Sequence, residues 1–392
     1  MTILFYHRSP INPNSGGISR ITHVLGQALM SHGYKIYYIS ELRSEQENSG
    51  ITQYYLPNSS IVQCEENVLY LKELVVNLNI NIIINQFALN GVSARFLNIC
   101  KKEFDFKLIS CFHNSILTPI YNFSFQKEFF LKRKNIGWLS DLLKTDFVKE
   151  LLFFIYKRKH KKHYLEAVLG SDACVNLCQG LEDELLKLIG FKSFKNLYLI
   201  PNCIDVPNDK CNFNSKINEV LWVGEFTMEV KRPDIVLSSW KLIQNIHPDW
   251  KLRLLGSGRD LEQMQTYSKS LGLKNVSFEG RVNPDKYYKR ARILCVTSAH
   301  ESFSLVTVEA KSYNVVPIVM NSFPAASIVV RDNIDGLLVK PMDVLEYAKK
   351  LDYLMANEDI LKCLSNNCAD GIEMFKSNTI VKQWISLFDE LI

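Results

Sequence analysis

Short apolar runs and amphipathic segments alternate along the whole chain. Apolar runs of strand length, bounded by polar loops, occupy residues 2–8, 35–40, 81–86, 107–113, 173–178 and 197–200 in the first half, and 219–226, 250–256, 275–280, 293–297 and 316–321 in the second. Apolar residues at helical spacing lie between them, as in residues 18–33 and 305–313. This alternation predicts an α/β fold built on parallel sheets.

The length of the chain predicts two domains. A chain of 392 residues is too long for one ordinary core, and two domains of roughly 200 residues are expected. A short polar stretch at residues 209–218 (DKCNFNSKIN) is typical of a linker. We therefore predict domains at 1–208 and 209–377, followed by a last amphipathic helix at 378–392.

Composition favours a globular cytoplasmic protein. Hydrophobic residues make up 47% of the chain, and its first residues (MTILFYHRSP) read as a strand, without the basic start of a signal peptide. Apolar runs of 18 or more residues do not occur, so a membrane-spanning helix is not expected. The ten cysteines lie singly inside apolar patterns, which is typical of reduced core residues and not of a disulfide framework or a zinc site.

Positive charge is concentrated in one region of the first half. Residues 127–163 contain eleven Lys or Arg against four acidic residues, interleaved with aromatic and aliphatic side chains. One interpretation of residues 121–163 is one or two helices with a solvated basic face. The other is a surface that contacts an anionic membrane or a lipid-linked acceptor. A nucleic-acid interface is disfavoured because the sequence shows no nucleic-acid-binding module.

The segment at 298–317 (SAHESFSLVTVEAKSYNVVP) carries the clearest chemistry. Glu301 is predicted in a loop after a buried strand, and Glu309 inside the helix that follows. The small residues Ser302 and Ser304 at the helix start let a ligand approach backbone amides, which attract an anion such as a phosphate. Glu309 is placed to accept hydrogen bonds from a ribose diol, so the segment suggests a nucleotide-sugar site.

The order Glu301, Phe303, a small residue, Leu305 and Glu309 resembles the Glu-x₇-Glu motif of retaining glycosyltransferases of family 4. The spacing alone is typical of a solvated helix face, but its position after a strand strengthens the likeness. Serine at 302 and 304 departs from the glycine usual in that family. The resemblance implies the GT-B fold, in which two Rossmann-like domains face each other across a cleft. It also implies that the helix at 378–392 crosses back to the N-terminal domain.

Candidate donor contacts lie in the second half. Lys231 follows the strand that ends at Gly224 and precedes a helix, where a lysine is placed to neutralise a diphosphate; an ordinary surface lysine is the alternative. Relatives carry arginine where this chain has Glu225, and Arg232 or Arg281 is expected to supply that charge. Further candidates are the loop glycines Gly256 and Gly258, the residues Gly280 and Val282 near the base, and the backbone at Phe303, Ser304, Leu305 and Val306.

Candidates in the first half follow predicted strands. Gly16 and Gly17 form a loop that either contacts the donor diphosphate or acceptor, or merely makes the turn. His113 ends a strand and would lie beside the transferred sugar by resemblance, although a lone histidine is more often structural. Asn202, in a segment that resembles the family's IPNG-D, either approaches the cleft or has a turn role.

The resemblance implies a retaining transferase with Glu301, His113 and Lys231 as catalytic residues. The donor is expected to be a nucleotide sugar, a UDP-sugar before a GDP-sugar, and the acceptor a saccharide or lipid-linked saccharide of bacterial surface polysaccharide or lipopolysaccharide synthesis. Neither a metal nor another cofactor is expected. The location is cytoplasmic, with peripheral membrane attachment as an extension. Two rivals are a nucleotide-sugar epimerase or phosphorylase of the same architecture and a non-catalytic partner subunit.

Overall fold

The computed structural model describes residues 1–14, 16–43, 50–117, 120, 123–124, 142–143, 145–206 and 212–392. These residues belong to two compact units. The first combines Met1–Leu117, Asp146–Asp205 and Phe375–Ile392, and the second contains Val206–Met374 together with Thr118–Thr145, most of which lies outside the described residues. The basic segment predicted at 121–163 is therefore described only from residue 145 onward, apart from a few isolated positions.

The first unit is a Rossmann-like α/β domain. Its parallel sheet has seven strands in the order β3-β2-β1-β4-β5-β6-β7. These strands are β1 (Thr2–His7), β2 (Lys35–Ser40), β3 (Gln53–Tyr55), β4 (Ile82–Asn85), β5 (Lys107–Phe112), β6 (Ala173–Asn176) and β7 (Leu197–Leu199). The helices are α1 (Gly17–Ser31), α2 (Glu65–Leu78), α3 (Gly91–Glu103), α6 (Asp146–Gly170), α7 (Gln179–Ile189) and α15 (Ser377–Leu391).

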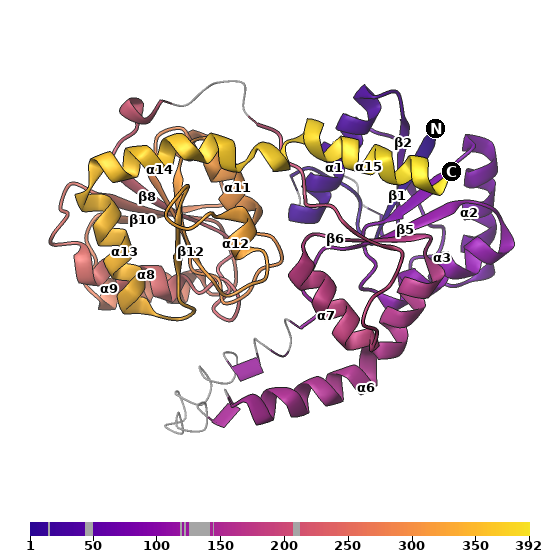
Figure 1. Cartoon of the computed structure of the whole chain (residues 1–392), viewed down its shortest axis with the longest axis horizontal. Coiled ribbons are helices and arrows are strands. Elements are labelled where there is room, and N and C mark those ends of the chain that lie inside the picture. Colours follow the sequence, from indigo (N-terminus) through magenta and orange to yellow (C-terminus); the bar gives the residue numbers. More distant parts are fainter. Residues whose placement is uncertain are drawn as a thin grey trace. The chain divides into compact units, whose positions relative to one another are not determined.

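The C-terminal helix α15 belongs to the first unit, as the fold prediction stated. Its buried residues Ile380, Trp384 and Phe388 join the core that β1, β4 and α1 build on one face of the sheet. Figure 1 shows α15, in yellow, running beside α1. The other face of the sheet packs against α2 and α3 through a separate apolar cluster that includes Leu71 and Phe96. Both faces of this sheet are thus covered, which explains the continuous apolar runs of its strands.

The second unit repeats the architecture with six parallel strands in the order β10-β9-β8-β11-β12-β13. These are β8 (Glu219–Val223), β9 (Lys251–Leu255), β10 (Val276–Gly280), β11 (Ile293–Val296), β12 (Val316–Met320) and β13 (Leu337–Val339). The helices are α8 (Pro233–Ile243), α9 (Leu261–Ser270), α10 (Asp285–Tyr288), α11 (Leu305–Ser312), α12 (Ala326–Val329), α13 (Val344–Ala356) and α14 (Glu358–Gly371). Single 3₁₀ turns lie at Phe213–Ser215 and Glu373–Phe375.

Each sheet reverses its strand order at one place. In the first unit the chain moves outward from β1 to β2 and β3 and then returns to place β4 on the other side of β1. In the second unit the reversal lies between the neighbouring strands β8 and β11. Open parallel sheets bind ligands beyond the carboxyl ends of the strands at such a reversal. A ligand site is therefore expected at the loops after β1 and β4 in the first unit and at the loops after β8 and β11 in the second.

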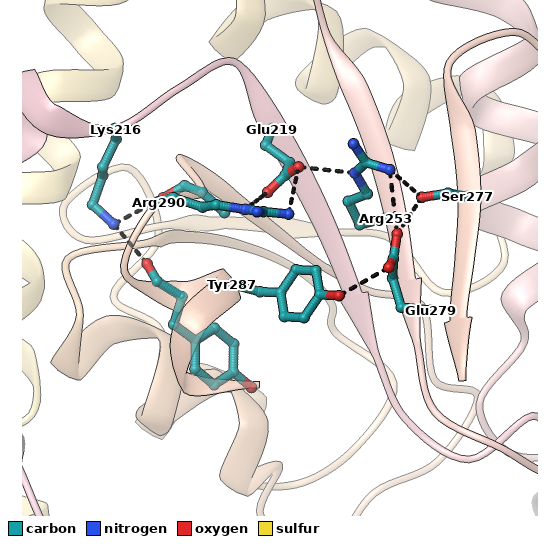
Figure 2. Close-up of polar contacts among 9 residues, drawn as sticks. Lys216, Glu219, Arg253, Ser277, Glu279, Tyr287 and Arg290 are labelled. Carbon is teal, nitrogen blue, oxygen red and sulfur yellow. Dashed lines mark hydrogen bonds and ion pairs between the residues drawn. The ribbon is translucent and has the colours of Figure 1, made fainter. Parts of the chain in front are cut away.

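An ion network stabilises the second unit at the opposite end of β8. Glu219, the first residue of β8, is fully buried and accepts hydrogen bonds from Arg253 on β9 and from Arg290 before β11, with nitrogen to oxygen distances of 2.8–3.2 Å. Arg253 continues the network to Ser277 and Glu279 on β10, and Tyr287 donates to Glu279. Figure 2 shows Glu219 lying between the two guanidinium groups. The network joins three neighbouring strands without involving the carboxyl ends of β8 and β11.

Candidate functional site

The structure brings Lys231 and Glu301 together at the strand reversal of the second unit. Lys231 lies in the loop after β8 and Glu301 in the loop after β11, and the Lys231 Nζ atom is 2.5 Å from the Glu301 Oε1 atom. Ser298 also donates to this Glu301 oxygen, at 2.8 Å. The two side chains keep 24% and 11% of their surface exposed, so the pair is largely desolvated and still accessible to a ligand. This pairing is stronger evidence for a site than either residue alone.

Thr297 fixes the loop that carries Lys231. Its side chain is fully buried, and its Oγ1 atom contacts the carbonyl oxygens of Lys231 and Arg232 at 3.0 and 2.9 Å. The same hydroxyl accepts the indole N–H of Trp222 at 3.0 Å, and the amide of Ala299 donates to the carbonyl of Val230 at 2.7 Å. These hydrogen bonds hold the loops after β8 and β11 together, and they therefore keep Lys231 and Glu301 within contact distance of each other.

Helix α11 begins at Leu305, four residues after Glu301, so Glu301 lies in the loop and Glu309 inside the helix, as predicted. Its N-cap residue Ser304 has the left-handed backbone conformation, with φ 61° and ψ 67°, which is unusual for a residue with a side chain. The Ser304 hydroxyl contacts the Thr307 hydroxyl at 2.8 Å. The amides of the first turn, including Leu305 and Val306, lie where an α-helix leaves donors without intrahelical acceptors. Phe303 is only 2% exposed, so its ring packs into the core and its backbone alone is suited to contact a ligand.

A buried ion pair anchors α11 two residues beyond Glu309. Lys311 and Asp335 are 0% exposed, with the Lys311 Nζ atom 3.0 Å from Asp335 Oδ1 and 2.9 Å from the Val329 carbonyl. Burial lowers the pKa of the Lys311 ammonium, and the Asp335 carboxylate opposes that shift. Glu309 itself is half-buried on α11, on the turn that precedes Lys311. The ion pair therefore holds the helix that carries Glu309, whereas Glu301 lies in the loop before that helix.

Gly256 and Gly258 have a structural reason to be glycine. Their φ angles are +141° and +155°, and a Cβ atom would lie 1.8 Å from the Gly224 carbonyl oxygen at position 256 and 2.6 Å from the Phe226 backbone at position 258. The loop after β9 is thus pressed against the loop after β8. The close packing of the two loops is sufficient to explain why both positions are glycine. The predicted contact of Gly256 and Gly258 with the donor phosphates or base stays a prediction. Gly224 lies at the centre of this contact.

The cations near the site differ in their partners. Arg232 forms a two-bond ion pair with Asp234, with both distances 2.9 Å, so its charge is largely neutralised. Arg281 is exposed after β10, followed by the half-buried Val282. Arg259, which our sequence reasoning passed over, lies in the glycine loop after β9 and pairs with Glu229. Of the basic residues considered for a diphosphate, Lys231 has the position best supported by the geometry.

His300 is a further residue that the sequence reasoning did not single out. It is 4% exposed and lies in the loop after β11, directly before Glu301. Burial lowers the pKa of the His300 imidazole to about 4, with Glu301 raising it and Lys231 lowering it. The ring is therefore neutral at physiological pH. Its position immediately before Glu301 of the motif is the sequence feature that could have marked His300 as a candidate.

The first unit places His113 in a polar group at the carboxyl ends of β1, β4 and β5. The His113 Nε2 atom contacts the Gln86 Oε1 atom, and the Asn202 side chain lies near the same ring, where it raises the pKa of the imidazole. Burial and, to a smaller extent, the neighbouring His7 together lower the pKa of His113 to about 4. A small pocket lined in part by Gln86, His113 and Asn202 opens here. The structure thus joins two predicted residues and adds His7 and Gln86.

The diglycine loop begins α1 in the first unit. Gly16 is the N-cap residue, with φ 148° and ψ 174°, a conformation that residues with a Cβ atom rarely adopt, and Gly17 is the first helical residue. The amide of Arg20 donates to the Gly16 carbonyl at 3.0 Å. The backbone conformation alone therefore requires glycine at position 16. Contact with a ligand at Gly16 and Gly17 stays a prediction.

Across the described part of the chain, no group of three or more His, Cys, Asp or Glu side chains is arranged to hold a metal ion. Within that same part, none of the helices combines the length and apolar character needed to cross a bilayer.

Comparison with solved structures identifies the architecture as the GT-B fold. The chain aligns over its whole length with the Anabaena protein Alr3699/HepE in complex with UDP, at a TM-score of 0.76 and 13% identity, and covers all of that chain. It aligns equally completely with the lipopolysaccharide outer core galactosyltransferase WaaB, at a TM-score of 0.70 and 16% identity. At these identities the likeness concerns the fold, and it confirms the predicted fold class.

Comparison of the sequence points to the glycosyltransferases. Residues 208–370 match the family model described as glycosyl transferases group 1. Over 189 residues the chain is 32% identical to an α-1,4-N-acetyl-D-galactosaminyltransferase of Campylobacter jejuni that acts on an undecaprenol-diphosphate-linked saccharide. That alignment includes 47% of this chain and 52% of the relative, so the chain spans about half the length of the relative. The family model and this relative together support a glycosyltransferase.

Proposed function

We propose that this protein is a retaining glycosyltransferase of family 4, which moves a sugar from a nucleotide sugar to a hydroxyl of a saccharide or lipid-linked saccharide. We take a UDP-sugar as the donor. UDP-containing complexes of HepE and of the pneumococcal O-GlcNAc transferase GtfA, which share the fold, support this choice. The pathway we propose is bacterial surface polysaccharide or lipopolysaccharide synthesis, since similar proteins are named as a lipopolysaccharide 1,6-galactosyltransferase and an amylovoran biosynthesis glycosyltransferase.

The observation that carries the proposal is the position of the Lys231–Glu301 pair. It lies at the strand reversal of the second unit, beside the start of α11 and inside the segment that matches the family model. An ammonium group and a helix N-terminus both favour an anion, and the diphosphate of a nucleotide sugar supplies one. Glu301 supplies an acceptor for sugar hydroxyls and Glu309 an acceptor for the ribose. The combination suits a molecule with a diphosphate between two polyols.

The proposed chemistry is stabilisation of the leaving group. As the bond from the anomeric carbon to the diphosphate breaks, negative charge develops on the phosphate oxygen, where Lys231 and the amides at 304–306 would stabilise it. The acceptor hydroxyl attacks from the same face, and its proton passes to the departing phosphate, which accounts for retention. The neutral ring of His113 is suited to hydrogen-bond the transferred sugar, because an uncharged imidazole does not repel positive charge at the anomeric carbon.

We further propose that α6 brings the protein to an anionic membrane that holds the acceptor. On this helix Phe147, Leu151, Phe154 and Ile155 are 49–79% exposed. Five basic residues follow within two turns, at Lys157, Arg158, Lys159, Lys161 and Lys162. Exposed apolar side chains next to basic ones are typical of helices that rest on anionic lipid. Exposure of this extent on a helix packed against α3 and α7 is otherwise costly in water.

Donor binding is the first test. Purified protein is heated with UDP, GDP, ADP and their sugars, and the ligand that binds the folded state raises the unfolding temperature. We expect UDP and one UDP-sugar to do so. Product analysis with donor alone and then with a saccharide acceptor separates transfer from epimerisation, and NMR of the product reports the anomeric configuration. Failure of every nucleotide to stabilise the protein would reject the proposal, and an inverted product would reject retention.

Membrane binding is tested by sedimentation with two kinds of vesicle. One contains phosphatidylcholine alone, and the other contains phosphatidylcholine with about 30% phosphatidylglycerol, an anionic lipid. We expect binding to the anionic vesicles that weakens with salt, and its loss in Phe154→Ser. Ile246→Ser is the matched control, because both side chains are 63% exposed and Ile246 lies in the second unit. Equal loss in both variants, or equal binding to neutral vesicles, would contradict the assignment to α6.

A further inference from the structure

A buried carboxylate holds the loop that follows β5. Glu184 lies on α7, and a single oxygen, Oε2, accepts hydrogen bonds from the Ser115 hydroxyl at 2.6 Å, the Ile116 amide at 3.0 Å and the Leu117 amide at 3.3 Å. Glu184 is 7% exposed and Ser115 is 4% exposed. These contacts join residues almost 70 positions apart in the chain. They fix the backbone of residues 115–117 against α7.

This arrangement costs free energy that a simpler residue would avoid. Burial raises the pKa of the Glu184 carboxyl, and the hydrogen bonds from Ser115, Leu117 and Ile116 only oppose that shift. All three donors are uncharged. An apolar residue at a buried helical position often stabilises a fold more than a buried charge does. Leu181 and Leu188, three residues before and four residues after Glu184, are buried on the same face of α7, so this face accepts leucine. A carboxylate here is therefore explained better by what it holds in place.

What it holds in place is the backbone next to His113. The last residue of β5 is Phe112, and the first hydrogen bond to Glu184 is at Ser115, so only His113 and Asn114 lie between two fixed points. Backbone held on both sides restricts the directions in which the imidazole can point. Gln86, which directly follows β4, contacts the His113 ring, and Asn202, in the segment after β7, lies near it.

We propose that Glu184 is the positioning residue for His113, acting through the hydrogen bonds that hold residues 115–117. It does not touch the ligand. The catalytic consequence rests on the proposed function, whereas the effect on the His113 ring does not. Without the Oε2 acceptor, two backbone amides and a hydroxyl lose their partner, the loop relaxes toward solvent, and the imidazole loses its fixed contacts with Gln86 and Asn202.

The structural test is histidine NMR on the full chain labelled at the imidazole carbons. His113 is assigned with His113→Asn, and its titration is followed in the wild type and in Glu184→Ala. The wild-type ring should titrate near its lowered pKa of about 4. In Glu184→Ala the pKa should rise by about one unit or more toward the value of a hydrated imidazole. His7 faces the same ring, so its resonance is followed in the same spectra.

Three further variants make this test decisive. Glu184→Gln retains an oxygen able to accept all three hydrogen bonds and should restore the wild-type titration. Asp183→Asn, an exposed neighbour on the same helix, should leave it unchanged. If Glu184→Ala does not fold, Ser115→Ala removes one donor and should shift the pKa of His113 in the same direction by less. An unchanged His113 titration in the folded variants of Glu184 and Ser115 overturns the proposal.

The catalytic consequence is tested by a double-mutant cycle on transfer, with the nucleotide sugar that stabilises the protein most. We expect Glu184→Ala to lower kcat by about tenfold to hundredfold while the affinity for UDP, measured per folded protein, stays constant. In a His113→Ala background the same change should cost less than threefold. Multiplicative losses would show that Glu184 acts independently of His113. If His113→Ala itself leaves turnover unchanged, the catalytic role of His113 fails, and the NMR result still decides the positioning.

Discussion

Lys231→Met is the substitution whose outcome the geometry determines most directly. The change removes the ammonium group and keeps most of the aliphatic chain that packs near Gly224. A charge-assisted hydrogen bond to a phosphate contributes about 1.5–3 kcal/mol, but Lys231 must first leave Glu301, and a partly exposed ion pair is worth up to about 1 kcal/mol. The net loss is about 1–2 kcal/mol, so the dissociation constant for UDP should rise about 5- to 30-fold.

Substitution of the partner residue, Glu301, should have the opposite effect on the affinity for UDP. Glu301→Gln removes the competing negative charge, and UDP lacks the transferred sugar that Glu301 is proposed to bind. This variant should therefore bind UDP as tightly as the wild type or up to about fivefold more tightly, and yet lose turnover with the full donor. Isothermal titration calorimetry at fixed salt measures both constants, with Lys241→Met as an exposed control on α8. If Glu301→Gln weakens UDP binding as much as Lys231→Met does, Lys231 is not the diphosphate ligand.

Three other expectations concern stability. Ser304→Gly should have a free energy of unfolding about 1 kcal/mol higher than Ser304→Ala, because both variants lose the hydroxyl that contacts Thr307 and only glycine adopts the left-handed conformation without strain; equal values in urea unfolding would contradict this. Glu219→Ala should lower it by about 3–5 kcal/mol by leaving two guanidinium groups without their buried partner, with Glu219→Gln intermediate. His300 has a lowered pKa of about 4 in the folded state, so the folded protein binds fewer protons than the unfolded chain, and stability is lost as the pH falls from about 6.5 toward 4. His300→Gln should reduce the difference in unfolding free energy between pH 7 and pH 5, and an unchanged difference would argue against this assignment.

Most of the fold could be predicted from the sequence, because buried parallel strands are nearly continuous apolar runs. The runs at 35–40 and 316–321 became β2 and β12, and the amphipathic tail became α15. The three-residue strand Gln53–Tyr55 was missed, since a short edge strand with half-buried residues has no distinctive pattern. The long helix α6 was expected only as one or two helices, because its apolar residues face solvent as well as the core.

The candidate site could be predicted less completely. Residues that follow strands, such as Lys231 and His113, were found because the end of a strand is visible in the sequence. Their partners were not, because Thr297, Ser298 and Gln86 act through contacts that join separate loops. The glycines at 256 and 258 also have a structural role that the sequence does not show, because an added Cβ atom would clash with the loop after β8; their contact with a ligand stays a prediction. Sequence position indicates which edge of a sheet carries a site, whereas tertiary contacts decide which atoms meet.

The Lys231–Glu301 pair gives a physical reason for a preference for the intact donor over UDP. In the ligand-free arrangement each charge neutralises the other in a largely desolvated place. On the proposed function, we expect a diphosphate alone to draw Lys231 away and to leave the Glu301 carboxylate with the Ser298 hydroxyl as its hydrogen-bond donor among the described residues. A nucleotide sugar supplies both replacements together, the phosphate for the ammonium group and sugar hydroxyls for the carboxylate, so neither group is left poorly solvated. We infer that the affinity of Glu301→Gln for UDP approaches that for the UDP-sugar, whereas the wild type separates the two.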